Sequence, residues 1–353
     1  MLAAVMLATA LTVAGEDGRS VFVLTSTNNS SANDVVVFKL NTGGSPSLTW
    51  VDTLPTGGKG SVAALTNAGI LQFKDDLGAV ANNGSNTVTQ LVRDNNFITI
   101  GRTINLAPGC MNPDSVALGK DHLYVVDTVC AESFPWPWGS TPDGKITLSD
   151  STAAQIAVGQ SWAAVTFTDA TYTGPPGVLQ LWLTGDGALS GSSTAITLKE
   201  YASSVPLGEA FWGDILGFTP AHDQDSFAIL NKAGLEYPIV GPTPYGPPNN
   251  APCWVAKGRG NIWYTGNSPG HAISIFFSDS QGGAFYKSVP LQVMGTPTDI
   301  TVSPDGKWLA VIYTYDGYGY IAVYSIDAYG DLTYEATSPA VSVPGFSGVA
   351  FSE

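Results

Sequence analysis

The chain has 353 residues, and with 44% hydrophobic residues it is long enough to bury a large core in one domain. It carries 14 lysines and arginines against 29 aspartates and glutamates, a formal net charge of −15, and the cations form no basic stripe. Because clustered cations are what neutralise the phosphates of nucleic acids, this balance argues against nucleic acid as a partner, and it also disfavours an anionic membrane surface.

Residues 1–15, MLAAVMLATALTVAG, form an apolar run that is too short to span a bilayer but suits the core of a signal peptide. No Lys or Arg precedes the run, and a buried N-terminal strand is the alternative. Asn28, Asn29 and Asn83 each begin an Asn-x-Ser sequon in a predicted loop and are candidate glycosylation sites. We therefore expect residues 1–15 to be a leader and residues 16–353 to form a single domain of a secreted protein.

Seven short apolar strands recur along the chain with a similar order of small, aliphatic and polar residues. A period of roughly 40–50 residues is typical of a β-propeller, in which each blade is a four-stranded sheet. A β-sandwich or a β-helix would need a different period. The sequence therefore predicts an all-β, seven-bladed β-propeller. The predicted inner strands begin at Ser61, Asp114, Ala163, Asp214, Cys253, Thr298 and Ser347.

The last predicted strand, SGVAF from Ser347, lies at the C-terminus, and two strand-like runs follow the leader at Ser20 and Asp34. We expect the C-terminal strand to pair into the N-terminal blade, because this closes the ring and removes exposed strand edges. The inner strands then line a central tunnel. We name the end where they begin the loop face, which also carries the loops between second and third strands. The opposite end, the turn face, carries the turns between first and second and between third and fourth strands.

The three cysteines are placed unequally along the chain. Cys110 precedes the predicted inner strand at Asp114, and Cys130 follows the next predicted strand, His122–Thr128. Both are expected at the same end of one blade, so the sequence predicts a Cys110–Cys130 disulfide and a free, buried Cys253.

Long loops that converge on one end of a tunnel are a common place for a binding site. On the loop face we expect a rim of aromatic side chains that can lie against the flat face of a sugar ring or a lactone. Packing between blades is the alternative for each of them. The predicted rim residues are Trp162, Trp212, Trp254 and Phe346.

Three segments carry a family resemblance: GTPTDITVSPDGKWLAVIYT from Gly295, NNAPCWVAKGRGNIWYTGNSPGHAISIF from Asn249, and GAVANNGSNTVTQLV from Gly78. They resemble the lactonase-type seven-bladed propellers, a family that includes bacterial 6-phosphogluconolactonase, the fungal carboxymuconate lactonizing enzyme and secreted fungal relatives. The resemblance covers nearly the whole chain after the leader. It implies the opening or closing of a lactone ring without a metal or an organic cofactor, so we expect neither.

The lactonizing members of that family use a His, an acidic residue and arginines that clamp substrate carboxylates. This chain has only four arginines, all expected away from the loop face: Arg19, Arg93, Arg102 and Arg259. Because a bidentate Arg is the usual partner of a carboxylate or phosphate, we expect a neutral sugar lactone or a similar small cyclic ester as substrate.

Hydrolysis of a lactone needs a base to activate water, donors for the oxyanion and an acid for the departing alkoxide. His271, in a predicted loop-face loop, is the expected general base, because His122 and His222 are expected on the turn face. A loop histidine in water is the alternative. Glu209 and Asp214 lie on one segment beside aromatic residues, where desolvation would raise the pKa of a carboxyl group; acidic residues that only cap a turn are the alternative.

Further donors and acceptors are expected on the loop face. Lys59 is a candidate to stabilise the oxyanion, and Asn82 and Asn86 are candidate substrate-binding amides. Asp127 and Asp299 are candidate carboxylates for a divalent cation, although no zinc-type spacing, nucleophile elbow or P-loop is present in the sequence. Two other functions stay open for this expected monomer: a non-catalytic propeller that binds glycan or protein through the aromatic rim, and a lactonizing cyclase or isomerase.

Overall fold

The computed structural model places most of the chain. It describes residues 19–61, 69–137, 139–148, 151–169, 177–198, 206–220, 226–233, 236–240, 252–268, 270–279, 282–292, 295–343 and 346–353. The predicted leader, His222 and most of the strand predicted from Ser61 lie outside these ranges. Among the described residues, no helix is long and apolar enough to cross a membrane.

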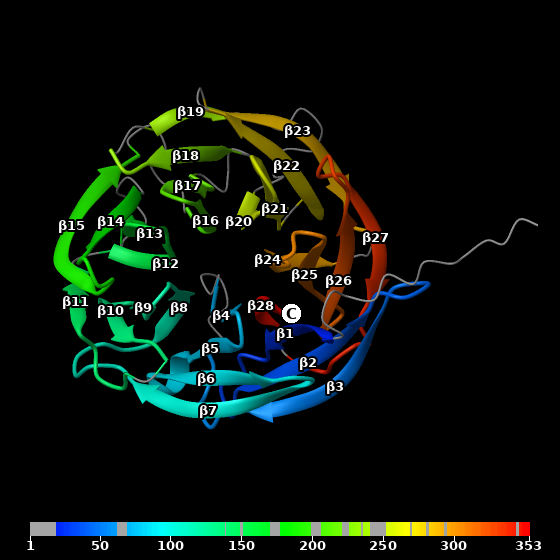
Figure 1. The fold of residues 1–353 in the computed structure, drawn as a ribbon, viewed down its shortest axis with the longest axis horizontal. Helices are drawn as coiled ribbons and strands as arrows, with labels where there is room; N and C mark the ends of the chain where they lie inside the picture. The colour runs from blue at the N-terminus through cyan, green and yellow to red at the C-terminus, as the bar shows by residue number, and fades with distance from the viewer. Residues whose placement is uncertain are drawn as a thin grey trace, which may run out of the picture.

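The described residues form 28 strands in seven four-stranded sheets, arranged as blades around a ring (Figure 1). From the inside outward, blade 1 contains β28 (Ser347–Ser352), β1 (Val21–Ser26), β2 (Asp34–Asn41) and β3 (Ser47–Pro55). Blade 2 contains β4 (Leu71–Lys74), β5 (Leu77–Asn82), β6 (Thr87–Asp94) and β7 (Phe97–Asn105). Blade 3 contains β8 (Pro113–Leu118), β9 (His122–Asp127), β10 (Cys130–Pro135) and β11 (Gly144–Thr147).

Blades 4 and 5 contain β12 (Ser151–Val158), β13 (Trp162–Asp169), β14 (Gly177–Leu183) and β15 (Leu189–Thr197); β16 (Glu209–Trp212), β17 (Ile215–Phe218), β18 (Phe227–Asn231) and β19 (Glu236–Val240). Blades 6 and 7 contain β20 (Pro252–Lys257), β21 (Ile262–Asn267), β22 (Ala272–Asp279) and β23 (Gly282–Pro290); β24 (Thr296–Val302), β25 (Trp308–Tyr315), β26 (Tyr318–Ile326) and β27 (Leu332–Thr337).

The ring closes as the sequence predicts. Strand β28 pairs antiparallel with β1 and supplies the inner strand of blade 1. Arg93 of blade 2 holds both partners: its guanidinium donates to Ser352 Oγ at 2.9 Å and to the carbonyl oxygen of Ser20 at 2.6 Å, and it lies over the ring of Phe22. The fold class and the closure are therefore confirmed.

Four of the seven predicted inner strands are correct, namely β8, β20, β24 and β28. The segments from Ala163 and Asp214 instead form the second strands β13 and β17, and β12 and β16 are the inner strands of their blades. In blade 2 the inner strand is β4, and most of the segment predicted from Ser61 lies outside the described residues. The first and second strands of a blade are both buried on both faces, so both show the same apolar pattern.

The hydrophobic core lies between adjacent blades. Strand β9 is buried at every position, whereas the outermost strand β3 of blade 1 is largely exposed. Each blade therefore presents apolar side chains on both faces to its two neighbours. Between blades 5 and 6, for example, Phe227 packs against Trp263 and Phe276.

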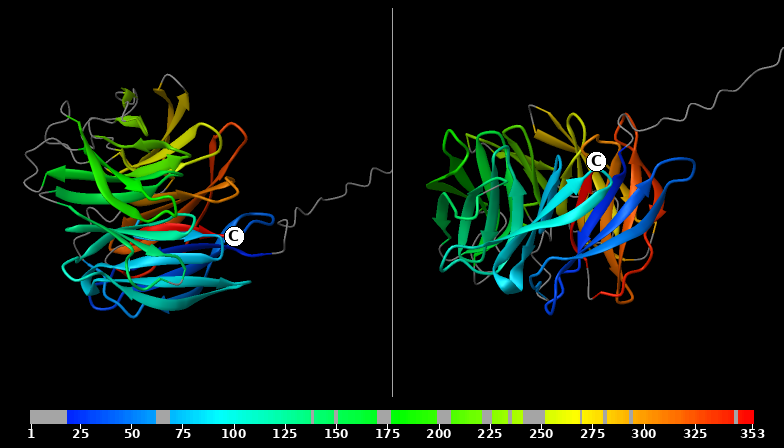
Figure 2. Two further views of the ribbon diagram at one scale, coloured as in Figure 1. Left: turned by 60° about the vertical axis from the view of Figure 1, so that its left-hand side comes forward. Right: turned by 60° about the horizontal axis from the view of Figure 1, so that its bottom comes forward.

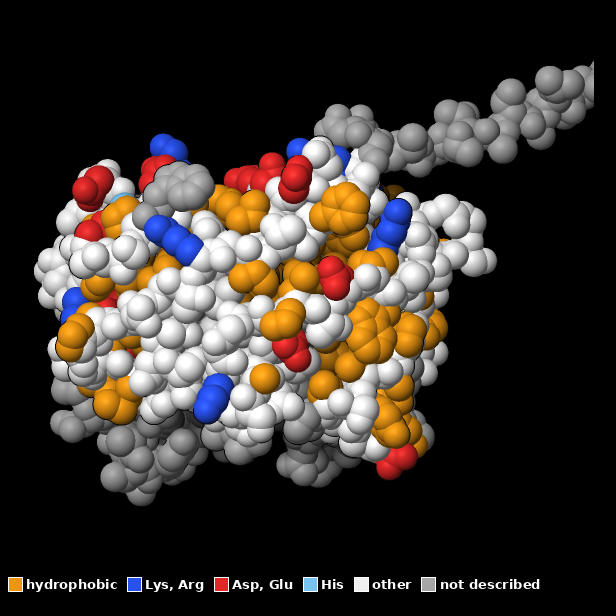
Figure 3. Space-filling model, turned by 90° about the horizontal axis from the view of Figure 1, so that it is seen from below, with side chains coloured by type: hydrophobic (Ala, Val, Ile, Leu, Met, Phe, Trp, Pro, Cys, Tyr) orange, Lys and Arg blue, Asp and Glu red, His pale blue; other side chains and the backbone are white. Residues whose placement is uncertain are grey.

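The two faces of the ring differ in composition. In the right-hand view of Figure 2 the C-terminal end of β28 lies at the upper side of the ring, which is therefore the turn face. Figure 3 shows acidic and basic side chains gathered along this upper rim. Short turns there hold charged pairs, such as Asp75 and Asp76 between β4 and β5 and Lys120 and Asp121 between β8 and β9.

Cys110 and Cys130 form a disulfide with a Cα–Cα distance of 5.5 Å, as the sequence predicts, and Cys253 is buried and takes no part in this bond. The bond joins the segment before β8 to the start of β10 and closes a loop with a sequence separation of 20. We expect the double substitution Cys110→Ser/Cys130→Ser to lower the free energy of unfolding by about 3 kcal/mol, measured by urea titration. Reduction of the native protein should give a similar loss, and an unchanged midpoint in both would contradict a stabilising role.

Candidate functional site

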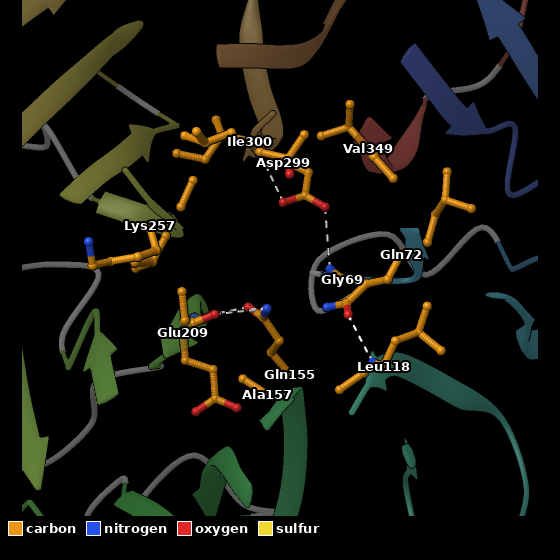
Figure 4. Close-up of a pocket in the computed structure, with 18 of the residues that line it drawn as sticks. Gly69, Gln72, Leu118, Gln155, Ala157, Glu209, Lys257, Asp299, Ile300 and Val349 are labelled. Atoms are coloured by element: carbon orange, nitrogen blue, oxygen red, sulfur yellow. Dashed lines mark hydrogen bonds between the residues drawn. The ribbon is translucent and has the colours of Figure 1, made fainter. Parts of the chain in front are cut away.

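A cavity of about 300 Å³ lies on the axis of the ring and is lined by residues of all seven inner strands. This volume is at the lower end of the range for small-molecule sites, roughly 300–1,000 Å³. Most of the lining residues are aliphatic, and backbone and side-chain polar groups also face the cavity. Figure 4 shows the polar side chains among them, which are Gln72, Gln155, Asp299 and Lys257, and also Glu209.

Asp299, at the loop-face end of the cavity, is 7% exposed. Its Oδ1 accepts a hydrogen bond from the backbone N–H of Ile300 at 2.8 Å, and its Oδ2 accepts one from Gly69 at 3.3 Å. Burial raises the pKa of Asp299 to about 7, against the opposing effect of the backbone N–H groups of Ile300, Gly69 and Val349. A carboxyl group that titrates near neutrality can act as a general acid or base.

Two glutamine amides lie in the same layer. Gln72 Oε1 accepts a hydrogen bond from the backbone N–H of Leu118 at 3.2 Å, and Figure 4 shows the amide on the side of the cavity where Gly69 meets Asp299. Gln155 pairs with the backbone of Glu209 through both ends of its amide, at 2.9 and 3.0 Å. These bonds hold the amides in place, and they leave Gln72 Nε2 able to donate to a ligand.

Lys257, at the turn-face end of the cavity, is occupied by the protein itself. Its Nζ donates to three backbone carbonyl oxygens around the β20–β21 turn, at 2.7, 2.7 and 3.2 Å. It also lies over the rings of Trp212 and Trp263, at 5.1 and 5.0 Å from their centroids. Burial lowers the pKa of Lys257 to about 8. The ammonium group therefore stabilises the turn rather than presenting a free cation to the cavity.

Glu209 begins β16, and Figure 4 shows its carboxyl group turned away from Asp299, beyond Ala157. The side chain is buried, and neither carboxylate oxygen has a hydrogen-bond partner of good geometry. Burial raises the pKa of Glu209 well above its usual value, and the nearby backbone N–H groups of Ala157 and Thr166 offset this only in part. The expected desolvation is present, but between blades 4 and 5 rather than at a substrate.

The other predicted catalytic residues do not come together. His271 is exposed on the β21–β22 loop of the loop face, where its Nδ1 faces the carbonyl oxygen of Gly295. Lys59 is also on the loop face and exposed. Asp214 lies in the β16–β17 turn of the turn face, where it accepts hydrogen bonds from the N–H and Oγ of Ser161 at 2.9 and 2.8 Å. None of them lines the axial cavity.

The predicted aromatic rim is wrong in its placement. Trp162 and Trp212 lie on the turn face. Trp162 is at the start of β13, the second strand of blade 4, and Trp212 is at the end of β16, the inner strand of blade 5. Trp162 is fully buried and meets Phe211 edge to face at 4.7 Å. Trp254 and Phe346 are at the loop-face ends of β20 and β28, but both are buried. Three of the four therefore pack inside the protein, which is the alternative stated above.

The predicted asparagine donors serve the fold. Asn82 Oδ1 accepts from Thr56 Oγ1 at 2.7 Å and from Asn33 Nδ2 at 3.0 Å, while its Nδ2 donates to Thr87 and Thr89 at 3.1 and 2.9 Å. Its hydrogen-bonding capacity is fully used. Asn86 is exposed, and its side-chain oxygen accepts a hydrogen bond from the backbone N–H of Asn112 at 2.7 Å.

A group of buried carboxyls beside the disulfide had only a weak sequence signal. Asp114 accepts a hydrogen bond from Asn83 Nδ2 at 2.7 Å, and burial, reinforced by the charge of Asp127, raises the pKa of Asp114 to about 7. Asp127 accepts hydrogen bonds from the backbone N–H groups of Val129 and Cys130, both at 2.6 Å. Unlike Asp299, it does not line the axial cavity. The two carboxylates proposed for a cation are therefore separate.

Among the residues that the structure describes, one group of three metal-ligand side chains lies within mutual reach: Cys110, Asp127 and Cys130. Both sulfurs of this group belong to the disulfide. The group is therefore accounted for by the disulfide and its neighbouring carboxylate, and it gives no support to a metal centre.

No protein-family model and no curated protein matches this chain. Among solved structures it is similar to a putative 6-phosphogluconolactonase from Bacteroides fragilis, with 14% identity and a TM-score of 0.65 over 96% of this chain and 99% of that one. A periplasmic gluconolactonase from Pseudomonas aeruginosa has 15% identity and a TM-score of 0.66 over 95% of this chain and 99% of that one. Virginiamycin B lyase from Staphylococcus aureus has 15% identity and a TM-score of 0.54 over 82% of this chain and 94% of that one. At these identities the likeness shows the fold alone, and the chain shares the β-propeller fold of these proteins.

Proposed function

We propose that the protein hydrolyses a small neutral lactone in the axial cavity. The observation that carries the proposal is Asp299, a buried carboxyl with a pKa of about 7 in a cavity of about 300 Å³ beside the amide of Gln72. Three of the structural neighbours are named as lactonases, which favours this chemistry over others that the fold can host. This site replaces the loop-face site centred on His271.

In the proposed reaction, ionised Asp299 takes a proton from a water molecule as the water oxygen attacks the lactone carbonyl carbon. Gln72 Nε2 donates a hydrogen bond to the carbonyl oxygen, which gains negative charge in the tetrahedral intermediate. When the ring C–O bond breaks, the proton held by Asp299 passes to the departing alkoxide oxygen. This transfer returns Asp299 to its ionised state, and the hydroxy acid product releases its own carboxyl proton to solvent.

The lining favours an uncharged substrate. None of the four arginines lines the cavity, and Lys257 already serves three carbonyl oxygens. A phosphorylated or multiply carboxylated lactone would need cationic partners that the cavity lacks. A neutral aldonolactone instead finds a carboxylate, amide groups and aliphatic walls.

We also propose that the protein is secreted. The Cys110–Cys130 disulfide fits an oxidising compartment, and the apolar run over residues 1–15 suits a leader. Of the three sequon asparagines, Asn28 and Asn83 are buried and hydrogen-bonded through their side chains, whereas Asn29 is half-buried. Asn29 is therefore the acceptor that we propose for a glycan.

The pH dependence of hydrolysis tests the role of Asp299. Because its ionised form is the base, kcat/KM should rise about tenfold per pH unit below pH 7 and level off above about 7. The measurement is a pH-stat assay on glucono-, galactono- and cellobiono-lactones. Asp299→Asn should lower kcat/KM by at least about 100-fold and remove this rise. The proposal would be contradicted if none of the three lactones were hydrolysed.

Asp299 also bonds backbone groups, so a second variant separates catalysis from folding. Gln72→Leu should lower kcat by about 100-fold, since it removes one oxyanion donor. Gln90→Leu is the matched control, because Gln90 is a buried amide that bonds the carbonyl oxygen of Pro137 outside the cavity. Equal losses in the two glutamine variants would point to folding and against the assigned donor.

A further inference from the structure

A second cavity, of about 500 Å³, opens on the turn face between blades 6 and 7. It shares no lining residue with the axial cavity. We name it the tyrosine groove. The residues that form it and matter here are Asn261, Ile262, Phe277, Tyr286, Tyr329 and Asp331.

The groove exposes two aromatic rings to solvent. Tyr329 is 78% exposed and Tyr286 is 47% exposed. Tyr286 lies on β23 and packs against Phe277 of β22, with ring centroids 5.0 Å apart. Single exposed apolar side chains are common on protein surfaces, but here two exposed aromatic rings line the same cavity.

The turn that carries Tyr329 is fixed before any ligand arrives. Asp327 Oδ1 accepts the backbone N–H groups of Tyr329 and Asp331, both at 2.8 Å. The carbonyl oxygen of Gly330 accepts a hydrogen bond from the hydroxyl of Tyr264 at 3.0 Å, which ties the turn of blade 7 to blade 6. A ligand would therefore meet a preorganised surface, and little conformational entropy would be lost on binding.

The polar groups of the groove are nearly neutral as a set. Asp331 Oδ1 lies 2.6 Å from Lys287 Nζ, and the same ammonium lies over the ring of Tyr286 at 5.3 Å from its centroid. Asn261 uses its backbone oxygen to accept the N–H of Ser278 and is itself exposed. The groove thus offers aromatic faces, a paired carboxylate and an amide, with no unpaired charge that would call for an ionic ligand.

We propose that the tyrosine groove binds a pyranose unit of an uncharged glycan. A pyranose has an apolar face of C–H groups, which packs on an aromatic ring, and a rim of hydroxyls, which bond carboxylate and amide groups. A cationic peptide and an anionic glycan are both disfavoured, because Lys287 and Asp331 already pair with each other. This binding site is independent of the proposed lactone hydrolysis.

Isothermal titration of the whole protein with cellohexaose, xylohexaose and laminarihexaose tests the inference. At least one of these neutral hexasaccharides should bind saturably, and Tyr329→Ala and Tyr286→Ala should each weaken it by about tenfold. Tyr329→Phe should retain most of the affinity, since the ring makes the contact. Tyr315→Ala is the matched control, because Tyr315 is 47% exposed on β25 at the loop face.

The variants distinguish binding in the tyrosine groove from binding in the axial cavity. Lactone hydrolysis should be unchanged in Tyr329→Ala, and its thermal unfolding should match that of the native protein, since the side chain is exposed. Absence of binding to all three oligosaccharides would overturn the proposal, and so would binding that survives Tyr286→Ala/Tyr329→Ala. Binding that is lost in Gln72→Leu but kept in the tyrosine variants would move the glycan to the axial cavity and would also overturn it.

Discussion

Deletion of residues 346–353 is expected to leave the chain unable to fold into a soluble ring. The deletion removes β28, whose residues Val349, Ala350 and Phe351 are buried, and it exposes the inner edge of β1. Burial of a Val or Phe side chain contributes about 1.5–3 kcal/mol each, and a domain is stable by only about 5–15 kcal/mol. The lost pairing with β1 and the lost contact of Asp299 with the backbone of Val349 add to this deficit.

The measurement is the soluble yield together with the unfolding transition followed by near-ultraviolet circular dichroism. We expect most of the truncated chain to be insoluble, because an unpaired strand edge templates aggregation. The matched control removes only Glu353, which lies after β28, and it should fold. A soluble truncated chain with the cooperative transition of the full-length protein would show that closure by β28 is dispensable.

Glu209→Gln is expected to stabilise the protein at neutral and alkaline pH. Because the pKa of Glu209 is raised in the folded state, the folded chain holds a proton there that the unfolded chain releases above its ordinary pKa of about 4.3. The stability of the native protein therefore falls as pH rises from that value to the raised pKa in the fold. The variant has no such loss, so the two should be similar at pH 4 and should diverge as pH rises.

At pH 8 the gain should reach at least about 1–3 kcal/mol, because each pH unit between the ordinary and the raised pKa of Glu209 costs the native protein about 1.4 kcal/mol. Urea titrations at pH 4, 6 and 8 measure it. Glu132→Gln is the matched control: burial raises the pKa of Glu132 as well, but its carboxylate accepts the backbone N–H of Ala107 at 3.1 Å, so removal of the charge also weakens a bond and the gain should be smaller. An equal, pH-independent change in both variants would contradict the role assigned to Glu209.

The fold could be predicted from the sequence more fully than the site. The number of blades follows from the repeat period, and closure follows from the position of SGVAF after Ser347. The inner strands of blades 4 and 5 were misplaced because β12, with the sequence STAAQIAV, carries a Gln in the tunnel and β16 has only four residues. Their second strands have the cleaner apolar pattern, so the sequence alone favours them as inner strands.

That error moved the expected site. With β13 and β17 read as inner strands, Trp162, Trp212 and Asp214 were expected on the loop face, and the structure places them at the opposite end. Gln72 carried no sequence signal, because its role depends on the meeting of β4, β8 and β24 in three dimensions. Asp299 was expected only as a cation ligand, and its raised pKa depends on burial that a sequence does not reveal.

The hydrogen bond from Thr25 Oγ1 to the carbonyl oxygen of Gly348 spans 323 residues. At roughly 5–20 residues per second, a ribosome needs on the order of 15–65 seconds between these two points. During that interval blade 1 lacks its inner strand β28, so the inner edge of β1 has no partner. Until β28 has been synthesised, the inner edge of β1 is therefore exposed to pairing with other chains.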